Sequence, residues 1–322
     1  MDIKKLLAIA AALTIAAVAL VLGIKKSNDM PIVAIVSYGP IPPMEASIIG
    51  IKKQLADQGF NEGQTVRYEI KDICFDHALI PQMVASLKNS KPAVMVLMAT
   101  PIAQFAKGKI NDIPLVYNVI TDPVDAGLIK DRNKSDGNVT GSSDMQDLGA
   151  LLTFVQTILP QAKTVGLLYM TSDSNDLTLV NMMRSAVASV GMSVIAIPVD
   201  QVRDIPIRMQ ELKGKADLIY VGASGLQSAL PIIASESQKM NIPMFNMEEQ
   251  AVRDGLALAS FGVNYESVGK NAGKLVAELL NGADIKNVAP VYPSLQDHQC
   301  FVNKKLAEKF GIKIPKNVTI VE

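Results

Sequence analysis

Short polar side chains stand directly after several apolar runs of this sequence, and their types suit the binding of a small polar molecule. Ser37 and Tyr38 follow "VAIV", and Thr100 follows "VMVLMA". Hydroxyl groups near helix N-termini bind a carboxylate or another anionic group, whereas carboxylates bind an ammonium group. The mixture predicts a site for a zwitterion or another polar small molecule. The candidate ligand-binding residues are Ser37, Tyr38, Thr100, Asp122, Ser142, Ser172, Asn175, Ser224 and Glu248, with Thr121, Ser143, Asp144, Thr171 and Glu249 beside them.

Several of these residues also fit a purely structural role. Thr100 and Ser224 could cap the helices that follow them, because hydroxyl oxygens accept hydrogen bonds from the free N–H groups of a first turn. Asp122 stands before a proline, a position typical of turns. Glu248 could start a solvated helix, which the helix dipole favours, and Tyr38 could pack in the core. Both interpretations stay open for each residue.

The sequence lacks the motifs of common enzyme classes. It contains no G-x-S-x-G, no G-x-x-x-x-G-K-[ST] and no strand-linked G-x-G-x-x-G, and its two His and two Cys residues have no zinc-like spacing. We therefore expect no catalytic residue, no metal and no cofactor, and predict that the protein is not an enzyme. The thiols are Cys74 and Cys300, and the sequence leaves open whether they pair.

The composition is that of a folded protein with balanced charge. The chain has 322 residues, of which 49% are hydrophobic and 19% charged, enough for two globular lobes with apolar cores. Lys plus Arg and Asp plus Glu both number 31, so the formal net charge is zero. Because nucleic-acid binders carry dense basic patches, we expect no nucleic-acid partner. We also predict a monomer.

The first 28 residues predict export. Lys4 and Lys5 precede an apolar stretch over 6–24 whose one polar side chain is Thr14. A basic start, an Ala-rich apolar run and the small-x-small sequence "AVA" are typical of a secretory signal peptide. The stretch is also long enough to span a bilayer, so the segment is either a cleaved signal peptide or an N-terminal membrane anchor. We therefore expect the rest of the chain in the periplasm or at the outer face of the cytoplasmic membrane.

After this segment, strand-like apolar runs alternate with amphipathic helical stretches. Such an alternation predicts parallel sheets that are covered on both faces. The order of runs repeats, with matching residues roughly 130 positions apart. The matching pairs are Val33 and Gly166, Ala99 and Ala223, Pro114 and Pro243, and Gly127 and Gly255. We therefore predict an α/β fold of two similar doubly wound parallel-sheet lobes, with 29–143 plus about 262–322 in lobe 1 and 144–261 in lobe 2.

These lobes have to position the polar loops. Open parallel sheets bind ligands at the carboxyl ends of their strands, so two such edges facing one another would make a central ligand cleft. Segments near 137–147 and 257–267 join the lobes and would act as a hinge for closure. "IPLVYNVITDPVDAGL" (113–128) and "IPMFNMEEQAVRDGLAL" (242–258) mark corresponding last strands. The loops within these two segments differ in sequence, and we expect them to determine which ligand binds.

Together, several segments resemble the ABC-transporter substrate-binding family that includes tryptophan- and tyrosine-binding lipoproteins. They lie within 31–316 and include "VAIVSYG", "MATPIAQFAKGKINDIPLVYNVITDPVDAGLI", "GNVTGSSD" and "NIPMFNMEEQAVRDGLALASFGVNYESVGKNAGKLVAELLNG". The resemblance implies a periplasmic-binding-protein fold of type I with a three-strand hinge. It also implies capture of a small molecule by lobe closure and delivery to a membrane permease that an ATPase powers.

The site residues match this family only in part. The loop over 41–45, the stretch "GASG" (222–225) and the acidic stretch over 248–250 depart from its pattern. The resemblance therefore implies an aromatic amino acid as one candidate ligand, and another amino acid or a more apolar molecule as others. The alternative function is a membrane-anchored ligand-sensing module without a transport role. The residues that match the family pattern are Thr100, Asp122, Asp173 and Asn175.

Overall fold

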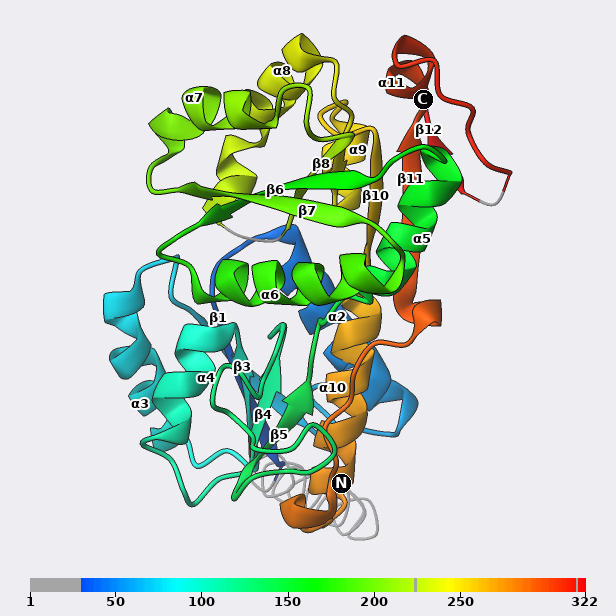
Figure 1. Cartoon of the computed structure of the whole chain (residues 1–322). Coiled ribbons are helices and arrows are strands. Elements are labelled where there is room, and N and C mark those ends of the chain that lie inside the picture. Colours follow the sequence, from blue (N-terminus) through cyan, green and yellow to red (C-terminus); the bar gives the residue numbers. More distant parts are fainter. Residues whose placement is uncertain (1–29, 223–224, 317) are drawn as a thin grey trace, which may run out of the picture. The chain divides into compact units, whose positions relative to one another are not determined.

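The computed structural model describes residues 30–222, 225–316 and 318–322, which divide into two compact units (Figure 1). Unit 1 comprises 30–119, 126–142 and 269–291, and unit 2 comprises 120–125, 143–268 and 292–322. Within the described ranges, no helix is both long enough and apolar enough to cross a membrane. The predicted signal peptide or anchor over 1–28 lies outside the described residues.

Unit 1 is built on a five-stranded parallel sheet. Its strands are β1 (Ile32–Ser37), β2 (Arg67–Asp72), β3 (Val94–Met98), β4 (Leu115–Asn118) and β5 (Val139–Ser142), in the order β2-β1-β3-β4-β5. Its helices are α2 (Pro42–Asp57), α3 (Ile80–Asn89), α4 (Thr100–Lys107) and most of α10 (Tyr265–Leu280). Every residue of β1 is buried, because the strand has helices on both faces. Val33 and Ile35 pack with α2 and α10, and α3 contacts β1 as well (Figure 1).

Helices α2 and α10 approach one another closely at two glycines. A Cβ atom on Gly269 would lie 2.0 Å from the carbonyl oxygen of Ser47, and one on Gly273 would lie 2.9 Å from that of Ile51. The hydroxyl of Ser47 accepts a hydrogen bond of 2.5 Å from Nδ2 of the buried Asn118, at the end of β4. The glycines therefore let α10 lie directly on the backbone of α2, which is itself tied to the sheet.

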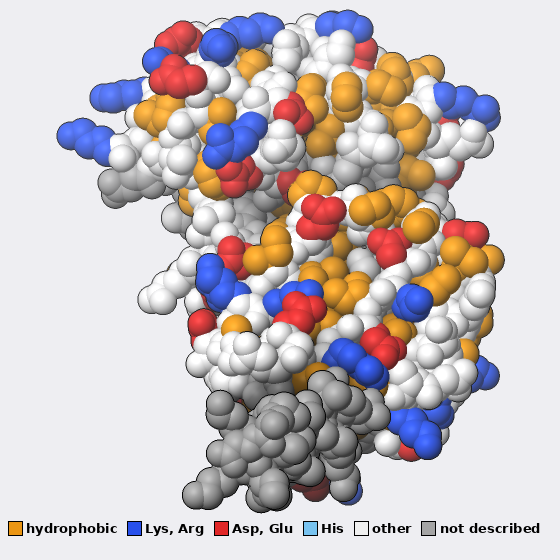
Figure 2. Space-filling model, turned by 180° about the vertical axis from the view of Figure 1, so that it is seen from behind, with side chains coloured by type: hydrophobic (Ala, Val, Ile, Leu, Met, Phe, Trp, Pro, Cys, Tyr) orange, Lys and Arg blue, Asp and Glu red, His pale blue; other side chains and the backbone are white. Residues whose placement is uncertain are grey.

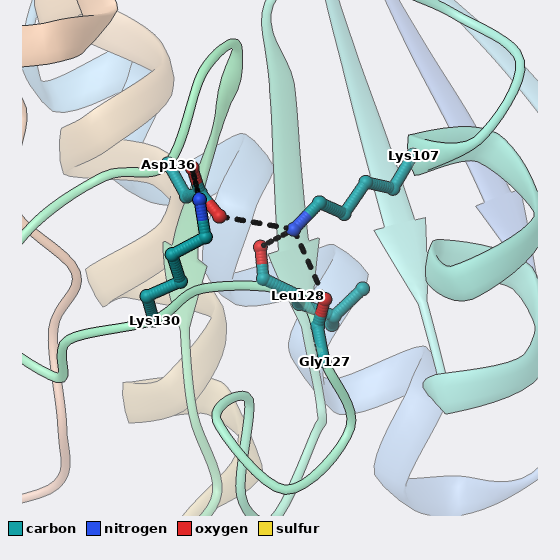
Figure 3. A network of polar contacts seen from close by, with 5 residues as sticks. All are labelled: Lys107, Gly127, Leu128, Lys130 and Asp136. Atoms are coloured by element: carbon teal, nitrogen blue, oxygen red, sulfur yellow. Dashed lines mark hydrogen bonds and ion pairs between the residues drawn. The ribbon is translucent and has the colours of Figure 1, made fainter.

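Lys107 at the end of α4 holds the loop that follows β4 (Figure 3). Its Nζ donates to the carbonyl oxygens of Gly127 at 3.0 Å and Leu128 at 2.9 Å, and to Oδ2 of Asp136 at 3.2 Å. One turn earlier, Nε2 of Gln104 donates to the carbonyl oxygen of Ala126 at 2.9 Å. Helix α4 thereby fixes the chain at the point where it re-enters unit 1 after 120–125.

Unit 2 is built on a seven-stranded sheet in the order β12-β11-β10-β9-β8-β6-β7. Strand β11 is antiparallel to β10, and the other neighbours are parallel. The strands are β6 (Thr164–Met170), β7 (Ser193–Val199), β8 (Leu218–Val221), β9 (Met244–Asn246), β10 (Ala259–Val263), β11 (His298–Asn303) and β12 (Thr319–Val321). The helices are α5 (Leu148–Ile158), α6 (Ser174–Ser189), α7 (Ile205–Met209), α8 (Leu230–Met240), α9 (Glu249–Arg253) and α11 (Lys304–Lys309).

Short 3-10 helices connect several of these elements. They lie at His77–Leu79, Val202–Asp204, Gln210–Leu212, Gly225–Ala229, Ile285–Asn287 and Leu295–Asp297. The face shown in Figure 2 carries Lys, Arg, Asp and Glu side chains interspersed with hydrophobic ones.

The predicted repeat is visible in the strand order. Strands β7-β6-β8-β9-β10 of unit 2 follow one another as β2-β1-β3-β4-β5 do in unit 1. Strands β4 and β9, which contain the two similar sequence segments, thus occupy equivalent places. Each also ends in a buried asparagine that pairs with a buried serine of the next strand: Asn118 with Ser142, and Asn246 with Ser260.

The boundaries of the two lobes differ from the prediction in two respects. We assigned about 262–322 to lobe 1, but unit 1 takes up only 269–291 of this segment. The remainder returns to unit 2, because β11 pairs with β10 and buries Phe301 and Val302 in the core of that unit. The short segment 120–125 also belongs to unit 2 rather than to lobe 1.

Candidate ligand-binding site

The structure distributes the predicted site residues over the two units. In unit 1, Ser37 ends β1, Thr100 starts α4 directly after β3, and Ser142 ends β5, so all three lie at the carboxyl edge of the sheet. All three are buried, whereas Tyr38 is half-buried. In unit 2 the structure describes Asp122, Ser172, Asn175 and Glu248. Ser224 lies outside the described residues.

Unit 2 contains a small pocket at the start of α6. Its volume is about 30 Å³, which is room for a water molecule or an ammonium group but not for a whole amino acid. Of the predicted residues that the structure describes, Asn175 lines this pocket. No Lys or Arg is among the described residues that line it. The lining residues are Thr121, Asp144, Gln146, Leu148, Asn175, Asp176, Leu179, Met182, Gly222 and Met247.

Asp144 is the most unusual group in this pocket. Its side chain is 6% exposed, and Oδ1 has no hydrogen-bond partner among the described residues. Thr121 hydrogen-bonds the carboxyl group, but burial outweighs this contact and raises the pKa of Asp144 to about 6. A buried carboxylate with a vacant acceptor is unfavourable on its own and is stabilised by a donor that carries positive charge.

Further acidic groups surround Asp144. Asp176 is buried in the first turn of α6, where its Oδ2 accepts a hydrogen bond of 2.7 Å from the backbone N–H of Met170. Burial raises the pKa of Glu248 above its ordinary value. The pKa of Tyr265 is raised well above its ordinary value by burial first, and then by the charges of Asp144 and Glu248. The electrostatic potential of this region therefore favours a cation.

A chain of hydrogen bonds fixes one wall of the pocket. The hydroxyl of the buried Tyr220 donates to Oε1 of Gln146, whose Nε2 donates to the carbonyl oxygen of Phe261 at 2.8 Å. Because both groups of the Gln146 amide are engaged, its orientation is set by the fold. Gly222 lines another wall of the pocket. A Cβ atom at this position would lie 2.3 Å from Cδ2 of Leu179. The pocket is therefore small because packed side chains bound it.

Asp122 stabilises a turn, which is the structural interpretation that its position before a proline offered. Its Oδ1 accepts hydrogen bonds from the backbone N–H groups of Val124 at 2.9 Å and Asp125 at 3.3 Å, as in an Asx turn. Ser172 is exposed in the loop between β6 and α6. Sequence reasoning did not select Asp144, Gln146, Asp176 or Tyr265 as ligand-binding residues, although Asp144 stood in the polar stretch that it noted.

The two cysteines are free thiols. Cys74 is exposed in unit 1 and Cys300 is half-buried in unit 2. Across the described ranges, no group of three or more His, Cys, Asp or Glu side chains is arranged to hold a metal ion.

Comparison with known proteins gives consistent matches over nearly the whole chain. A family model described as ABC transporter substrate binding protein matches residues 11–321. The tyrosine-binding protein of Clostridioides difficile (strain R20291) is 29% identical over 281 residues, which cover 87% of this chain and 80% of that protein.

Solved structures also match. An ABC domain in complex with L-Trp from Streptococcus pneumoniae has a TM-score of 0.79 at 26% identity and covers 91% of this chain and 100% of that chain. The ligand-free, open structure of a substrate-binding protein with adhesive properties from Clostridium difficile has the same TM-score and identity, and covers 91% and 99%. Together with the two parallel-sheet units, these matches confirm the predicted periplasmic-binding-protein fold of type I.

Proposed function

Because the chain belongs to the family of ABC transporter substrate-binding proteins, we propose that it captures an amino acid outside the cytoplasm. It then delivers this ligand to a membrane permease that an ATPase powers. Two relatives support an aromatic amino acid, since one is named for tyrosine and the other was solved with L-Trp.

The observation that carries this proposal is the vacant, buried acceptor of Asp144. An ammonium group brings both a positive charge and several N–H donors, which is what this carboxyl group lacks. The pocket of unit 2 has room for the ammonium group alone, so the rest of the ligand lies outside it. We propose that the two lobes close when the ligand binds.

Calorimetric titration of the purified protein tests the proposed ligand class. We expect L-tryptophan or L-tyrosine to bind, and indole-3-propionate, which keeps the ring and the carboxylate but lacks the ammonium group, to bind far more weakly. A thermal-shift screen of all common amino acids widens the test, because a ligand at 100 times its Kd stabilises the folded state by about 2.7 kcal/mol. Equal binding of the two compounds, or no response to any amino acid, would contradict the proposal.

We propose that the protein works in the periplasm or at the outer face of the cytoplasmic membrane. The support is the basic start and apolar run of residues 6–24. Cell fractionation followed by N-terminal sequencing tests this. Cleavage near residue 20 gives a free transport protein and argues against the membrane-anchored sensor, whereas an intact N-terminus in the membrane fraction keeps that alternative. Recovery of the chain in the cytoplasm would contradict export.

A further inference from the structure

Three aromatic rings gather at the carboxyl ends of β1 and β2 in unit 1. The ring of Tyr38 lies edge-on to that of Phe75, with centroids 5.6 Å apart, and edge-on to that of His77 at the same separation. The hydroxyl of Tyr38 is 3.0 Å from Nε2 of His77 and forms a hydrogen bond with it. This aromatic cluster thus stands at the edge of a parallel sheet where α/β proteins bind ligands.

The backbone around Phe75 is held in a costly conformation. Cys74 and Phe75 both have positive φ angles, 49° and 64°, which side-chain-bearing residues rarely adopt. The N–H of Phe75 donates to the carbonyl oxygen of Tyr38 at 2.9 Å, which ties the loop after β2 to the loop after β1. Gly39 leaves space for the ring, because a Cβ atom there would lie 2.4 Å from Phe75.

This arrangement does not bury Phe75. Its side chain is 49% exposed, so the loop holds a large apolar ring in contact with water. Residues in strained backbone conformations cluster at ligand-binding sites, so strain beside an exposed ring points to a binding role. The neighbouring Tyr38 packs against the apolar core of unit 1. The cluster is therefore anchored on one side and open on the other.

We propose that Tyr38 and Phe75 form the platform that binds the aromatic ring of the ligand. Aromatic pairs gain energy in offset or edge-on geometries beyond that of burying area, so such a platform selects a planar ring over an aliphatic side chain of similar size. The inference rests on the proposed capture of an amino acid and deepens it. The aromatic cluster of unit 1 selects the side chain of this amino acid.

The experiment compares the purified protein with its Phe75→Leu variant, which keeps an apolar side chain and removes the ring. The chain contains no tryptophan, so the fluorescence of bound L-tryptophan is measured without a tryptophan background from the protein. We expect Phe75→Leu to weaken L-tryptophan binding about tenfold, and to leave L-leucine binding within about twofold of the wild type. Ile207→Ala in α7, which alters a side chain that is 72% exposed, is the matched control and leaves both affinities unchanged.

Saturation-transfer NMR with free indole separates failure of this inference from failure of the proposed function. If no amino acid binds but indole contacts the wild type and not Phe75→Leu, the platform stands and amino-acid capture fails. If L-tryptophan binds Phe75→Leu as tightly as the wild type, the platform is wrong and amino-acid capture stands. Absence of both amino-acid and indole binding overturns both proposals. Circular dichroism and the melting temperature of each variant verify that it is folded.

Discussion

Asp144 is buried in unit 2 without a hydrogen-bond partner for Oδ1 among the described residues, so its negative charge is unfavourable in the ligand-free protein. Burial disfavours the charged form and raises the pKa of Asp144 to about 6. The same cost has two consequences of opposite sign. It makes the ligand-free fold less stable when the carboxyl group ionises, and it makes the ionised group a strong partner for an ammonium group.

The first consequence is a pH dependence of stability. An unfolded Asp has a pKa near 3.9, so the native state binds more protons than the unfolded state between about pH 4 and pH 6. The contribution of Asp144 is therefore fully present below about pH 4 and is lost as the pH rises through about 6, by at most about 3 kcal/mol. We expect urea unfolding of Asp144→Asn to lack this fall. Parallel pH profiles for variant and wild type would contradict the assignment.

The second consequence is a pH dependence of ligand affinity. If the ligand ammonium binds only ionised Asp144, the competent fraction falls about tenfold between pH 7 and pH 5, and the apparent Kd rises by the same factor. In Asp144→Asn we expect affinity to fall by more than about thirtyfold and to lose this pH dependence. Asp122→Asn is the control, because its carboxyl group serves a backbone turn that an amide also supports. A shared effect of both variants would contradict a specific role for Asp144.

Of the predicted site residues, Asn175 lines the pocket of unit 2, whereas the sequence analysis did not select Asp144. Asn175 was predicted from its place after an apolar strand, and it lines the pocket. Asp144 stood in the same list of polar loop residues as Ser143, but nothing in a single sequence tells a buried loop carboxylate from an exposed one. Tyr265 was not selected because it lies in the segment 257–267, which the sequence analysis assigned to the hinge. Burial of polar groups depends on tertiary packing, which local patterns do not encode.

At the scale of elements, the Lys107 contacts explain how α4 holds the returning chain. Replacing Lys107 with Met removes hydrogen bonds to two backbone carbonyls and to Asp136, and leaves the partly buried acceptors of Leu128 and Asp136 without this donor. We expect a loss of about 1–3 kcal/mol in the free energy of urea unfolding.

Lys130→Met is the control for this prediction. Lys130 also faces Asp136, at 3.7 Å, but its side chain is 88% exposed, so its removal costs less than about 0.5 kcal/mol. Equal losses for the two variants would mean that the charge of Asp136, rather than the bridged carbonyls, accounts for the effect.

The contact of α10 with α2 gives a second prediction at this scale. An added methyl group at Gly269 would meet the backbone carbonyl of Ser47 at 2.0 Å, and a backbone cannot rotate away as a side chain can. We expect Gly269→Ala to lower the free energy of unfolding by about 1–3 kcal/mol or more. Gly108→Ala is the control, because the added Cβ atom would lie 3.8 Å from the nearest atom and the φ angle of Gly108 is −77°. A tolerated Gly269→Ala would contradict this close packing.

Buried strands were predicted from apolar runs. The runs "VAIV" and "VMVLMA" fall in β1 and β3, because buried parallel strands read as continuous apolar segments. Strand β11 was not predicted, since it begins with the polar "HQC" and pairs antiparallel with β10. Strand β11 pairs with a strand that is distant in the sequence, and a local pattern does not reveal such a pairing. The C-terminal segment was therefore assigned to the wrong lobe.

At the scale of the whole molecule, the two units share one strand order and each has its own apolar core. The chain passes between them after residues 119, 125, 142, 268 and 291. Units with separate cores can rotate as rigid bodies when the dihedral angles of their connections change, and the proposed lobe closure requires such a rotation. The crossing after residue 268 lies inside α10, so a rotation at this point has to bend the helix.

Closure predicts that the ligand makes the molecule more compact. We expect small-angle X-ray scattering to give a smaller radius of gyration when L-tryptophan or L-tyrosine is present at saturating concentration. Asp144→Asn at the same ligand concentration controls for non-specific effects, because its weaker binding should leave a smaller share of the molecules occupied and therefore a larger mean radius. If the wild type binds ligand by calorimetry and its radius does not change, capture occurs without rigid-body closure. The five connections would then serve as fixed linkers rather than as a hinge.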